Sequence, residues 1–437
     1  MKVNIITLGC SKNTVDSEHL AGHFKAAGCT VVFDSEKNDA ELVLVNTCGF
    51  IGDAKEESVN MLLQQIAAKG NYNRRHSRDG RSRRLVAFGC LVERYRRDLQ
   101  GTMPEVDAWY GTHQWDDIVC REVSRSSKNA FTALRATSTP AHYAYLKISE
   151  GCNRSCSYCA IPLIRGRHVS RPMDELVAEA RRLVEQGVKE LILVAQDSTY
   201  YGLDLYGRRC LGELLERLAT QTGADWIRLH YTYPASFPLD AIEVMRRYDN
   251  ICNYIDIPLQ HINSRLLSSM QRGINRDGTL QLLSHFREQL PDVSVRTTLI
   301  VGYPGEGEAE FEELKEFVRQ AAFDRMGCFA YSQEEGTSAE ILGDPVSAEE
   351  KERRVSELMA IQDEISFAKN SQRVGKDYRV LIDRREGDYY VGRTEFDSPE
   401  VDDEVLIQAD RTLRIGTFCQ VRITQAFEHD LYGEVIG

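Results

Sequence analysis

A repeated alternation of short apolar runs and helical patterns dominates residues 141–370. Six runs have the length and apolar content of buried strands, and five segments with helical spacing fill the gaps between them. Such units favour parallel strands, each covered by a following helix, in a closed or partly closed barrel. The expected strands are residues 145–149, 190–197, 226–232, 254–260, 295–302 and 325–332, and the expected helices are residues 173–186, 211–222, 239–248, 277–290 and 308–321.

Three cysteines lie on the loop that follows the first of these strands. Cys152, Cys156 and Cys159 have the spacing C-x3-C-x2-C. Three thiolates on one loop can bind three corners of a cubic iron–sulfur cluster and leave the fourth iron without a protein ligand. The alternative is a structural zinc loop, but zinc sites use C-x2-4-C pairs and a fourth ligand close by. The nearest histidine, His168, lies nine residues beyond Cys159, so the spacing favours a cluster.

Residues 1–120 alternate strand and helix patterns in the same way and carry three more cysteines of interest. Cys10, Cys48 and Cys90 each follow an expected strand, at residues 3–8, 42–45 and 85–88, and each has a glycine neighbour. The carboxyl ends of parallel strands share one edge of a sheet, and glycine lets the backbone approach a bulky inorganic ligand. We therefore expect these cysteines to hold a second cluster; the alternative is three unrelated buried thiols.

Composition limits the remaining possibilities. A chain of 437 residues exceeds one hydrophobic core, so two or three domains are expected. A net charge of −12 argues against a protein that wraps nucleic acid. The first ten residues lack a signal-peptide pattern and no apolar run approaches membrane-spanning length, so we expect a cytoplasmic protein without a membrane partner. Core or surface thiols are expected at Cys29, Cys120, Cys210, Cys252, Cys328 and Cys419.

Three further segments are distinct in character. Residues 69–84 carry seven Lys or Arg and one Asp, which favours a solvated, mobile loop over an arm that contacts RNA phosphates. Residues 121–140 are typical of a linker. Residues 371–437 follow a long helical pattern and contain five short strand patterns, which suggests a small antiparallel barrel. That segment has 14 Asp or Glu and 9 Lys or Arg, a balance that favours a basic protein partner over phosphates.

The C-x3-C-x2-C loop, with Tyr158 before its last cysteine, resembles the signature of radical S-adenosylmethionine enzymes. The resemblance implies that the open iron binds S-adenosylmethionine, and that a partial (β/α)6 barrel holds it. Strand ends and turns in that superfamily contact this cofactor. The corresponding candidates are Tyr158, Gln196, Asp197, Gly302 and Glu306, with His230, Tyr233, Gln260 and His261 nearby on strand ends. For each of them, a turn, a cap or a satisfied buried polar group is the alternative.

Over the whole chain, the arrangement resembles the methylthiotransferases. The resemblance implies an α/β fold with an N-terminal parallel α/β domain (1–120), a linker (121–140), a radical SAM core (141–370) and a small C-terminal antiparallel β-barrel that is TRAM-like (371–437). Phrases such as SEGCNRSCSYCAIPLIRGRHVSRP and RTTLIVGYPGE are most similar to the RimO-type enzymes, which add a methylthio group to the β-carbon of an aspartate in the twelfth protein of the small ribosomal subunit.

That family resemblance implies the cofactors and partners. Two 4Fe-4S clusters are expected, with S-adenosyl-L-methionine as both methyl donor and radical source. Cys152, Cys156 and Cys159 hold the catalytic cluster, and Cys10, Cys48 and Cys90 hold the other. The ribosomal protein, free or on the ribosome, is the substrate, a flavodoxin- or ferredoxin-like protein supplies electrons, and the chain is taken as a monomer. The alternatives are a tRNA adenosine (N6-isopentenyl) 2-methylthiotransferase and a non-catalytic iron–sulfur scaffold.

Overall fold

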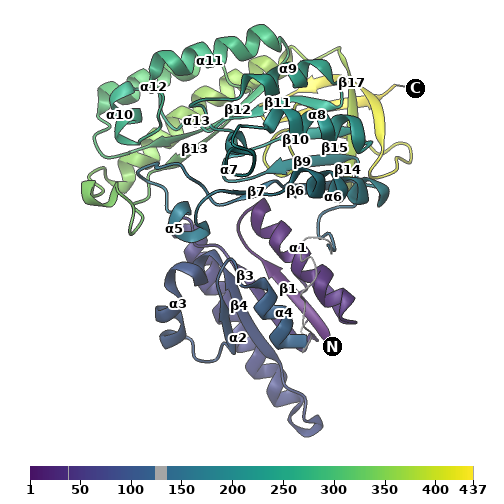
Figure 1. The fold of residues 1–437 in the computed structure, drawn as a ribbon. Coiled ribbons are helices and arrows are strands. Elements are labelled where there is room, and N and C mark those ends of the chain that lie inside the picture. Colours follow the sequence, from purple (N-terminus) through teal and green to yellow (C-terminus); the bar gives the residue numbers. More distant parts are fainter. Residues whose placement is uncertain (38, 124–134, 437) are drawn as a thin grey trace. The chain divides into compact units, whose positions relative to one another are not determined.

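A computed structural model gives the fold and describes residues 1–37, 39–123 and 135–436. Its contacts divide the chain into two compact units, coloured along the sequence in Figure 1. The first unit comprises Met1–Thr139, Glu150–Cys152 and Ala160–Arg167, and the second comprises Pro140–Ser149, Asn153–Cys159 and His168–Gly437. Most of the expected linker falls on residues 124–134, which lie outside the described residues. No helix in the described part of the chain combines the length and apolar character needed to cross a bilayer.

The first unit is built on a parallel sheet of five strands in the order β2-β1-β3-β4-β5. Its central strand β3 is buried at every position, as is typical of parallel strands covered on both faces. The expected strands β1, β3 and β4 are confirmed, whereas β2 and β5 were not predicted because runs this short carry little periodicity. The elements of this unit are β1 (Lys2–Thr7), α1 (Ser11–Ala26), β2 (Thr30–Phe33), β3 (Leu42–Thr47), α2 (Gly52–Arg75), η1 (Ser77–Asp79), β4 (Arg84–Gly89), α3 (Cys90–Thr102), β5 (Ala108–Tyr110), α4 (Trp115–Val123) and α5 (Ile161–Arg165).

Residues 69–84 form more regular structure than the sequence predicts. Helix α2 continues to Arg75, and the single turn η1 follows it. The basic side chains also serve the fold, since Lys69 Nζ lies 2.7 Å from the Asp107 carboxylate. The expectation of an irregular loop is therefore wrong from Lys69 to Arg75.

The segment that follows the undescribed residues is anchored to α1. Glu18 has a fully buried side chain and lies 2.5 Å from Arg135 Nη2. Its other carboxylate oxygen accepts a hydrogen bond of 2.6 Å from the backbone N–H of Ser138. A buried carboxylate is tolerated only with such partners, so residues 135–139 belong to the first unit.

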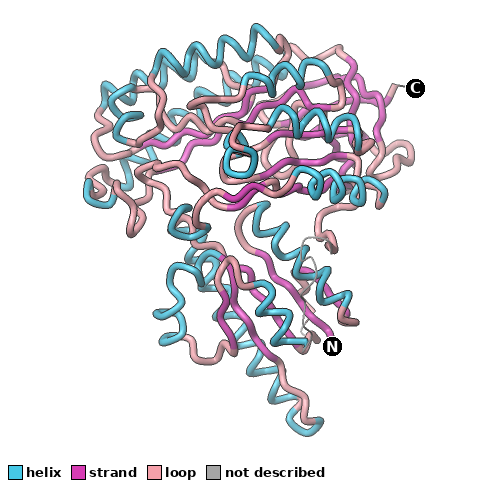
Figure 2. Tube along the Cα trace, in the orientation of Figure 1, coloured by secondary structure: helices cyan, strands magenta, loops and turns pink. Residues whose placement is uncertain are grey.

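The second unit contains a six-stranded sheet in the order β6-β9-β10-β11-β12-β13. All of its neighbouring strands are parallel, and among the described residues the outer strands β6 and β13 do not pair with each other. Figure 2 shows the alternation of helices (cyan) and strands (magenta) that the sequence predicts. The partial barrel is therefore confirmed, with strand bounds that differ by a few residues.

The elements of this part of the second unit are β6 (Tyr143–Lys147), β7 (Ser149–Glu150), β8 (Val169–Ser170), α6 (Met173–Glu185), β9 (Glu190–Val194), η3 (Ser198–Tyr200), α7 (Leu203–Tyr206), α8 (Leu211–Gln221), β10 (Trp226–Leu229), α9 (Leu239–Arg247), β11 (Ile251–Asp256), α10 (Ser264–Ser269), α11 (Arg276–Gln289), β12 (Ser294–Val301), α12 (Glu308–Ala321), β13 (Arg325–Ala330), η4 (Glu340–Leu342) and α13 (Ala348–Ser371).

The second unit ends in a closed barrel of five strands in the order β14-β15-β16-β18-β17. The expected small barrel is confirmed, although β16 and β18 run parallel while the other pairs are antiparallel. Closure removes the exposed strand edges that a sheet of this size would otherwise present. The strands are β14 (Asp377–Glu386), β15 (Tyr389–Arg393), β16 (Glu404–Gln408), β17 (Phe418–Ala426) and β18 (Asp430–Val435).

Residues 394–403, which join β15 to β16 and are called the docking loop here, connect the closed barrel to the partial barrel. Arg228 on β10 donates a hydrogen bond of 2.7 Å to the backbone oxygen of Glu395. Tyr254 on β11 donates one of 2.7 Å to the Asp402 carboxylate. Because these groups are buried, their hydrogen bonds replace those lost to water, and the two barrels pack as parts of one compact unit.

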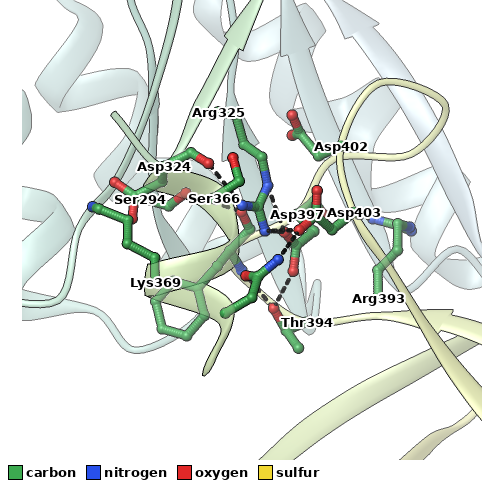
Figure 3. Close-up of polar contacts among 12 residues, drawn as sticks. Ser294, Asp324, Arg325, Ser366, Lys369, Arg393, Thr394, Asp397, Asp402 and Asp403 are labelled. Carbon is green, nitrogen blue, oxygen red and sulfur yellow. Dashed lines mark hydrogen bonds and ion pairs between the residues drawn. The ribbon is translucent and has the colours of Figure 1, made fainter. Parts of the chain in front are cut away.

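The docking loop also carries two carboxylates that share one cation, shown in Figure 3. Arg325, at the start of β13, lies 2.5 Å from Asp397 and 3.0 Å from Asp403. Asn370 on α13 donates a hydrogen bond of 2.6 Å to Asp403. Burial and the neighbouring Asp397 together raise the pKa of Asp403 to about 7, although Arg325 opposes the shift.

We expect Asp403→Asn to stabilise the protein in a pH-dependent way. With its folded-state pKa raised, Asp403 holds a proton in the folded state that the unfolded chain releases near pH 4, so it lowers stability as pH rises from about 4 to about 7. Asparagine does not ionise, so the variant does not lose this stability as the pH rises. Its advantage in free energy of unfolding should be near zero at pH 4 and reach about 4 kcal/mol at pH 8, because about three pKa units are worth about 1.4 kcal/mol each.

Paired thermal melts of the wild type and the variant at pH 5, 6, 7 and 8 measure this difference. Asp388→Asn, at an exposed position of the same barrel, is the control and should show no such trend. An advantage of Asp403→Asn that does not grow with pH would contradict the expected shift.

Candidate functional site

The three cysteines of the first unit, called the amino-terminal set here, lie at the ends of three adjacent strands. Strand β1 pairs with β3 from Val3↔Leu42 to Thr7↔Asn46, and β3 pairs with β4 up to Thr47↔Gly89. Because all three strands are parallel, their carboxyl ends share one edge of the sheet. This set comprises Cys10, Cys48 and Cys90. The sheet thus brings together residues that are about 40 positions apart, as the sequence predicts.

Glycines allow the loops of this set to approach one another closely. A Cβ atom at Gly9, whose φ is +93°, would lie 2.8 Å from the Cβ of Cys48. A Cβ atom at Gly49 would lie 2.6 Å from the Cα of Leu91, the residue that follows Cys90. Real Cβ atoms do not come so near another carbon atom, so these positions accept only glycine without movement of the cysteine loops.

The surroundings of the amino-terminal set lower the pKa of one thiol and raise the pKa of the other two. Burial would raise the pKa of Cys10, but Lys12, Arg165 and backbone N–H groups at the start of α1 outweigh it, so its pKa is lowered. Burial raises the pKa of Cys48, and raises that of Cys90 to about 11 despite the nearby Arg165. Binding of a metal cation, such as the iron of a cluster, would deprotonate the thiols of Cys48 and Cys90.

We expect Gly49→Ala to prevent assembly at the amino-terminal set. The added methyl group meets the backbone of Cys90 and Leu91, so the thiolates of Cys48 and Cys90 cannot keep their spacing. The iron content of the purified protein should fall by about half if each chain carries two clusters. Gly101→Ala, on α3, is the matched control, because its Cβ would meet nothing within 4 Å. Full iron content in Gly49→Ala would contradict the assignment of this set.

The other three cysteines, called the central set here, follow β6 on one loop. They are Cys152, Cys156 and Cys159. Cys152 belongs to the first unit, where its N–H donates a hydrogen bond of 3.1 Å to the Gly166 oxygen, and the other two belong to the second unit. A turn joins Cys156 and Cys159 through a backbone hydrogen bond of 3.1 Å.

Within the second unit, the Cys156 thiol is held by an arginine and a tyrosine. Arg272 is buried and places Nη1 3.4 Å from Cys156 Sγ and 3.2 Å from Tyr158 Oη. Tyr233 Oη lies 3.5 Å from the same sulfur and donates to the Arg272 oxygen at 2.8 Å. Hydrogen bonds and positive charge at a cysteine sulfur stabilise its thiolate form, so this surrounding suits a metal-bound thiolate.

The predicted contacts of the cofactor occupy different surroundings. Tyr158 is half-buried beside Arg272, and desolvation raises its phenol pKa well above the usual value. Asp197, just after β9, lies 2.7 Å from Arg154 and accepts a hydrogen bond of 2.9 Å from the Thr199 N–H, which caps η3. Gln196 is half-buried beside it. These three remain candidates for binding S-adenosylmethionine.

Gly302 and Glu306 shape the turn after β12. A Cβ at Gly302, whose φ is +75°, would lie 2.4 Å from the Lys351 side chain. Glu306 is fully buried and accepts a hydrogen bond of 3.1 Å from the Gly302 N–H, while Arg354 of α13 lies 2.7 Å from its carboxylate. Because His261 Nε2 is also 3.5 Å away, the protein itself provides the partners of this carboxylate.

His230, another strand-end residue nominated from the sequence, contacts the docking loop. Its Nε2 lies 2.8 Å from Ser398 Oγ of the docking loop, and its ring stacks on Tyr254. Burial lowers its pKa to about 3, so it is neutral and structural. Sequence reasoning missed Arg165, Arg154 and Arg272, because a single arginine carries no periodic signal before the fold brings it to a sulfur or carboxylate.

Within residues 1–37, 39–123 and 135–436, no group of three or more His, Cys, Asp and Glu side chains is arranged to hold a single metal ion. The cysteines of a cubic cluster bind separate irons, and thus stand farther apart than the ligands of one ion.

Comparisons with known families match three segments. Residues 146–318 match the radical SAM superfamily, residues 374–436 match the TRAM domain, and residues 2–111 match an uncharacterized protein family. The match of the two named families agrees with the partial barrel and the closed barrel described above.

Curated relatives align over nearly the whole chain and share one name, ribosomal protein uS12 methylthiotransferase RimO. The protein of Phocaeicola vulgatus is 51% identical over 99% of both chains. That of Bacteroides thetaiotaomicron is 50% identical over 100% of this chain and 98% of the relative. That of Flavobacterium johnsoniae is 52% identical over 99% and 98%.

Solved structures share the fold at low sequence identity. The radical S-adenosylmethionine methyltransferase TsrM from Kitasatospora setae aligns with a TM-score of 0.54 at 13% identity, over 75% of this chain and 72% of that one. The cobalamin-dependent S-adenosylmethionine radical enzyme OxsB aligns with a TM-score of 0.53 at 8% identity, over 83% and 56%.

Proposed function

The chain belongs to the ribosomal protein uS12 methylthiotransferase family, and from this membership we propose that it adds a methylthio group to the β-carbon of an aspartate in that ribosomal protein. It is a radical S-adenosylmethionine enzyme, with a 4Fe-4S cluster and S-adenosylmethionine as cofactors. Its substrate is ribosomal protein uS12, and the site of attachment is part of the proposal.

In this proposal the central set, Cys152, Cys156 and Cys159, holds the catalytic cluster. A cluster held by these cysteines would supply, when reduced, the electron for cleavage of S-adenosylmethionine, and so the radical chemistry that activates the substrate carbon. The chain's own residues hold this chemistry in place. Arg272 and Tyr233 fix the Cys156 sulfur, and Tyr158 accepts a hydrogen bond of 3.2 Å from the same arginine.

The amino-terminal set, Cys10, Cys48 and Cys90, is proposed to hold a second 4Fe-4S cluster. Such a group supplies an open iron that can carry the sulfur to be methylated and transferred. Here the chain provides three convergent cysteines at adjacent strand ends and glycines that let the loops close around them. That convergence is the observation that supports the proposal most strongly.

The remaining contacts of the proposal concern position and exclusion of water. Asp197, Gln196 and the turn at Gly302 and Glu306 are proposed to line the binding site of S-adenosylmethionine. A carbon radical reacts with many groups, so a dry surrounding is required. A flavodoxin- or ferredoxin-like protein is proposed to donate electrons. We also propose that the chain acts as a monomer in the cytoplasm, where its ribosomal substrate is made.

Mass spectrometry of uS12 and of bulk tRNA tests this function, in cells with the gene deleted and restored. The uS12 aspartate peptide should lose the mass of one SCH2 unit on deletion and regain it on restoration. If that peptide were unchanged and a methylthio adenosine disappeared from tRNA instead, the chemistry would stand but the substrate would be the tRNA of the sibling family.

A further inference from the structure

We propose that Arg165 is a positioning residue that sets the reduction potential of the cluster at the amino-terminal set, by donating hydrogen bonds to Cys90. This inference rests on the proposed second cluster. Arg165 lies at the end of α5, in the segment Ala160–Arg167 of the first unit. It is 75 residues from Cys90 along the chain.

The geometry of the guanidinium is that of a two-point contact with one sulfur. Both Nε and Nη2 of Arg165 lie 3.3 Å from Cys90 Sγ. Nη2 also donates a hydrogen bond of 2.5 Å to the amide oxygen of Asn13, which stands 3.7 Å from the same sulfur. The rigid fork of an arginine suits such paired contacts, whereas a lysine offers one point charge.

Two carboxylates fix the other side of the guanidinium. Nη1 of Arg165 lies 2.7 Å from Asp16 and 3.2 Å from Glu150. The side chains of Arg165 and Asp16 are each only 2% exposed. A structural salt bridge would need only the Asp16 contact. The other two nitrogens, Nε and Nη2, both lie at hydrogen-bond distance from a cysteine sulfur, which is a poor hydrogen-bond acceptor as a thiol and a good one as a metal-bound thiolate.

The consequence for a bound cluster follows from charge. Hydrogen bonds to the cysteine sulfurs draw electron density from the irons, and this stabilises the reduced state of the cluster relative to the oxidised state. Arg165 therefore raises the potential of the amino-terminal cluster. Among the described residues, Arg165 donates hydrogen bonds to Cys90 but acts on Cys10 and Cys48 only through its charge, so Cys90 is the ligand through which the hydrogen bonds act.

The test isolates the amino-terminal cluster in a background where Cys152, Cys156 and Cys159 are all changed to Ala. Its midpoint potential is measured by electron paramagnetic resonance at poised potentials, which needs no turnover. Arg165→Gln is combined with Asp16→Asn, so that the buried Asp16 carboxylate is not left without its cation and the net charge stays the same. Asp16→Asn alone, Arg165→Lys and the exposed Arg167→Gln complete the set.

We expect the Arg165→Gln, Asp16→Asn protein to keep its cluster and to show a lower potential. At a fixed potential, the ratio of reduced to oxidised cluster should fall about tenfold, which is about 59 mV for a one-electron couple. Arg165→Lys should fall between this protein and the background, because it keeps the charge but loses the fork. Arg167→Gln, which removes the same charge from an exposed position two residues away, should match the background.

Two results would overturn the inference. One is an unchanged potential in the double variant, and the other is an equal shift in Arg167→Gln, which would show that the potential does not depend on the hydrogen bonds to Cys90. Failure of the proposed function is distinguishable, because the background protein would then contain no iron at the amino-terminal set before Arg165 is changed. In that case the inference fails together with the second cluster.

Discussion

Cys156→Ala abolishes the release of 5′-deoxyadenosine under reducing conditions, with a loss of at least about 10³-fold, or about 4 kcal/mol in the barrier. The expectation follows from the spacing of the central set, since removing one of three thiolates leaves a cubic cluster with two protein ligands. Arg272 would then face a methyl group in place of the sulfur it holds at 3.4 Å. Reaction with dithionite and S-adenosylmethionine, followed by chromatography, measures the product.

Cys328→Ala is the control for this result. Cys328 lies on β13 in the same unit, and burial raises its pKa to about 12, as expected of a packed thiol. Its replacement should leave 5′-deoxyadenosine formation near the wild-type rate. Normal turnover in Cys156→Ala would refute the assignment of the central set.

Cys48→Ala separates the two chemical steps. It should still cleave S-adenosylmethionine, because the central set is unchanged, but methylthio transfer to uS12 should fall at least about 100-fold, the upper range for losing even an indirect metal partner. Cys48 has the central place in the amino-terminal set, since β3 lies between β1 and β4. Both products are measured in one reaction with purified uS12.

Cys29→Ala provides the matched comparison in the first unit. Cys29 is half-buried and precedes β2, so its loss should change neither product. If Cys48→Ala formed the methylthio product at the wild-type rate, the three amino-terminal cysteines would be packed thiols, as the alternative from the sequence holds.

The fold and the two cysteine sets are predictable because their signals are periodic or local. Parallel strands place their carboxyl ends on one edge, so cysteines that follow β1, β3 and β4 must lie near one another once these strands are adjacent. The central set needs no fold at all, since its three cysteines share one loop. Short edge strands such as β2 and β5 lack this signal, and the packing of their neighbours decides them.

The arginines of the site could not be predicted in the same way. Arg165 reaches Cys90 across 75 residues and Arg272 reaches Cys156 across 116 residues. No pattern in the sequence links such pairs, because an arginine in a helix or loop is usually solvated. Only the tertiary fold brings these side chains to their sulfurs and buries them there.

The acidic balance of residues 371–437 also has a different meaning in the structure. From the sequence, 14 acidic and 9 basic residues favour a basic partner. Three of those carboxylates, all in the docking loop, have side chains that are at most 5% exposed and pair with arginines of the partial barrel: Asp397, Asp402 and Asp403. Much of the acidic excess therefore holds the closed barrel to the partial barrel, which leaves less of it for a substrate.

Iron content tests the central claim, that two cysteine sets hold two clusters. The wild type, purified and reconstituted without oxygen, should contain about eight irons per chain. The variant with Cys10, Cys48 and Cys90 changed to Ala should contain about four. The variant with Cys152, Cys156 and Cys159 changed to Ala should contain about four as well. Wild-type iron content in the first of these variants would show that the amino-terminal cysteines bind no cluster, and would contradict the account.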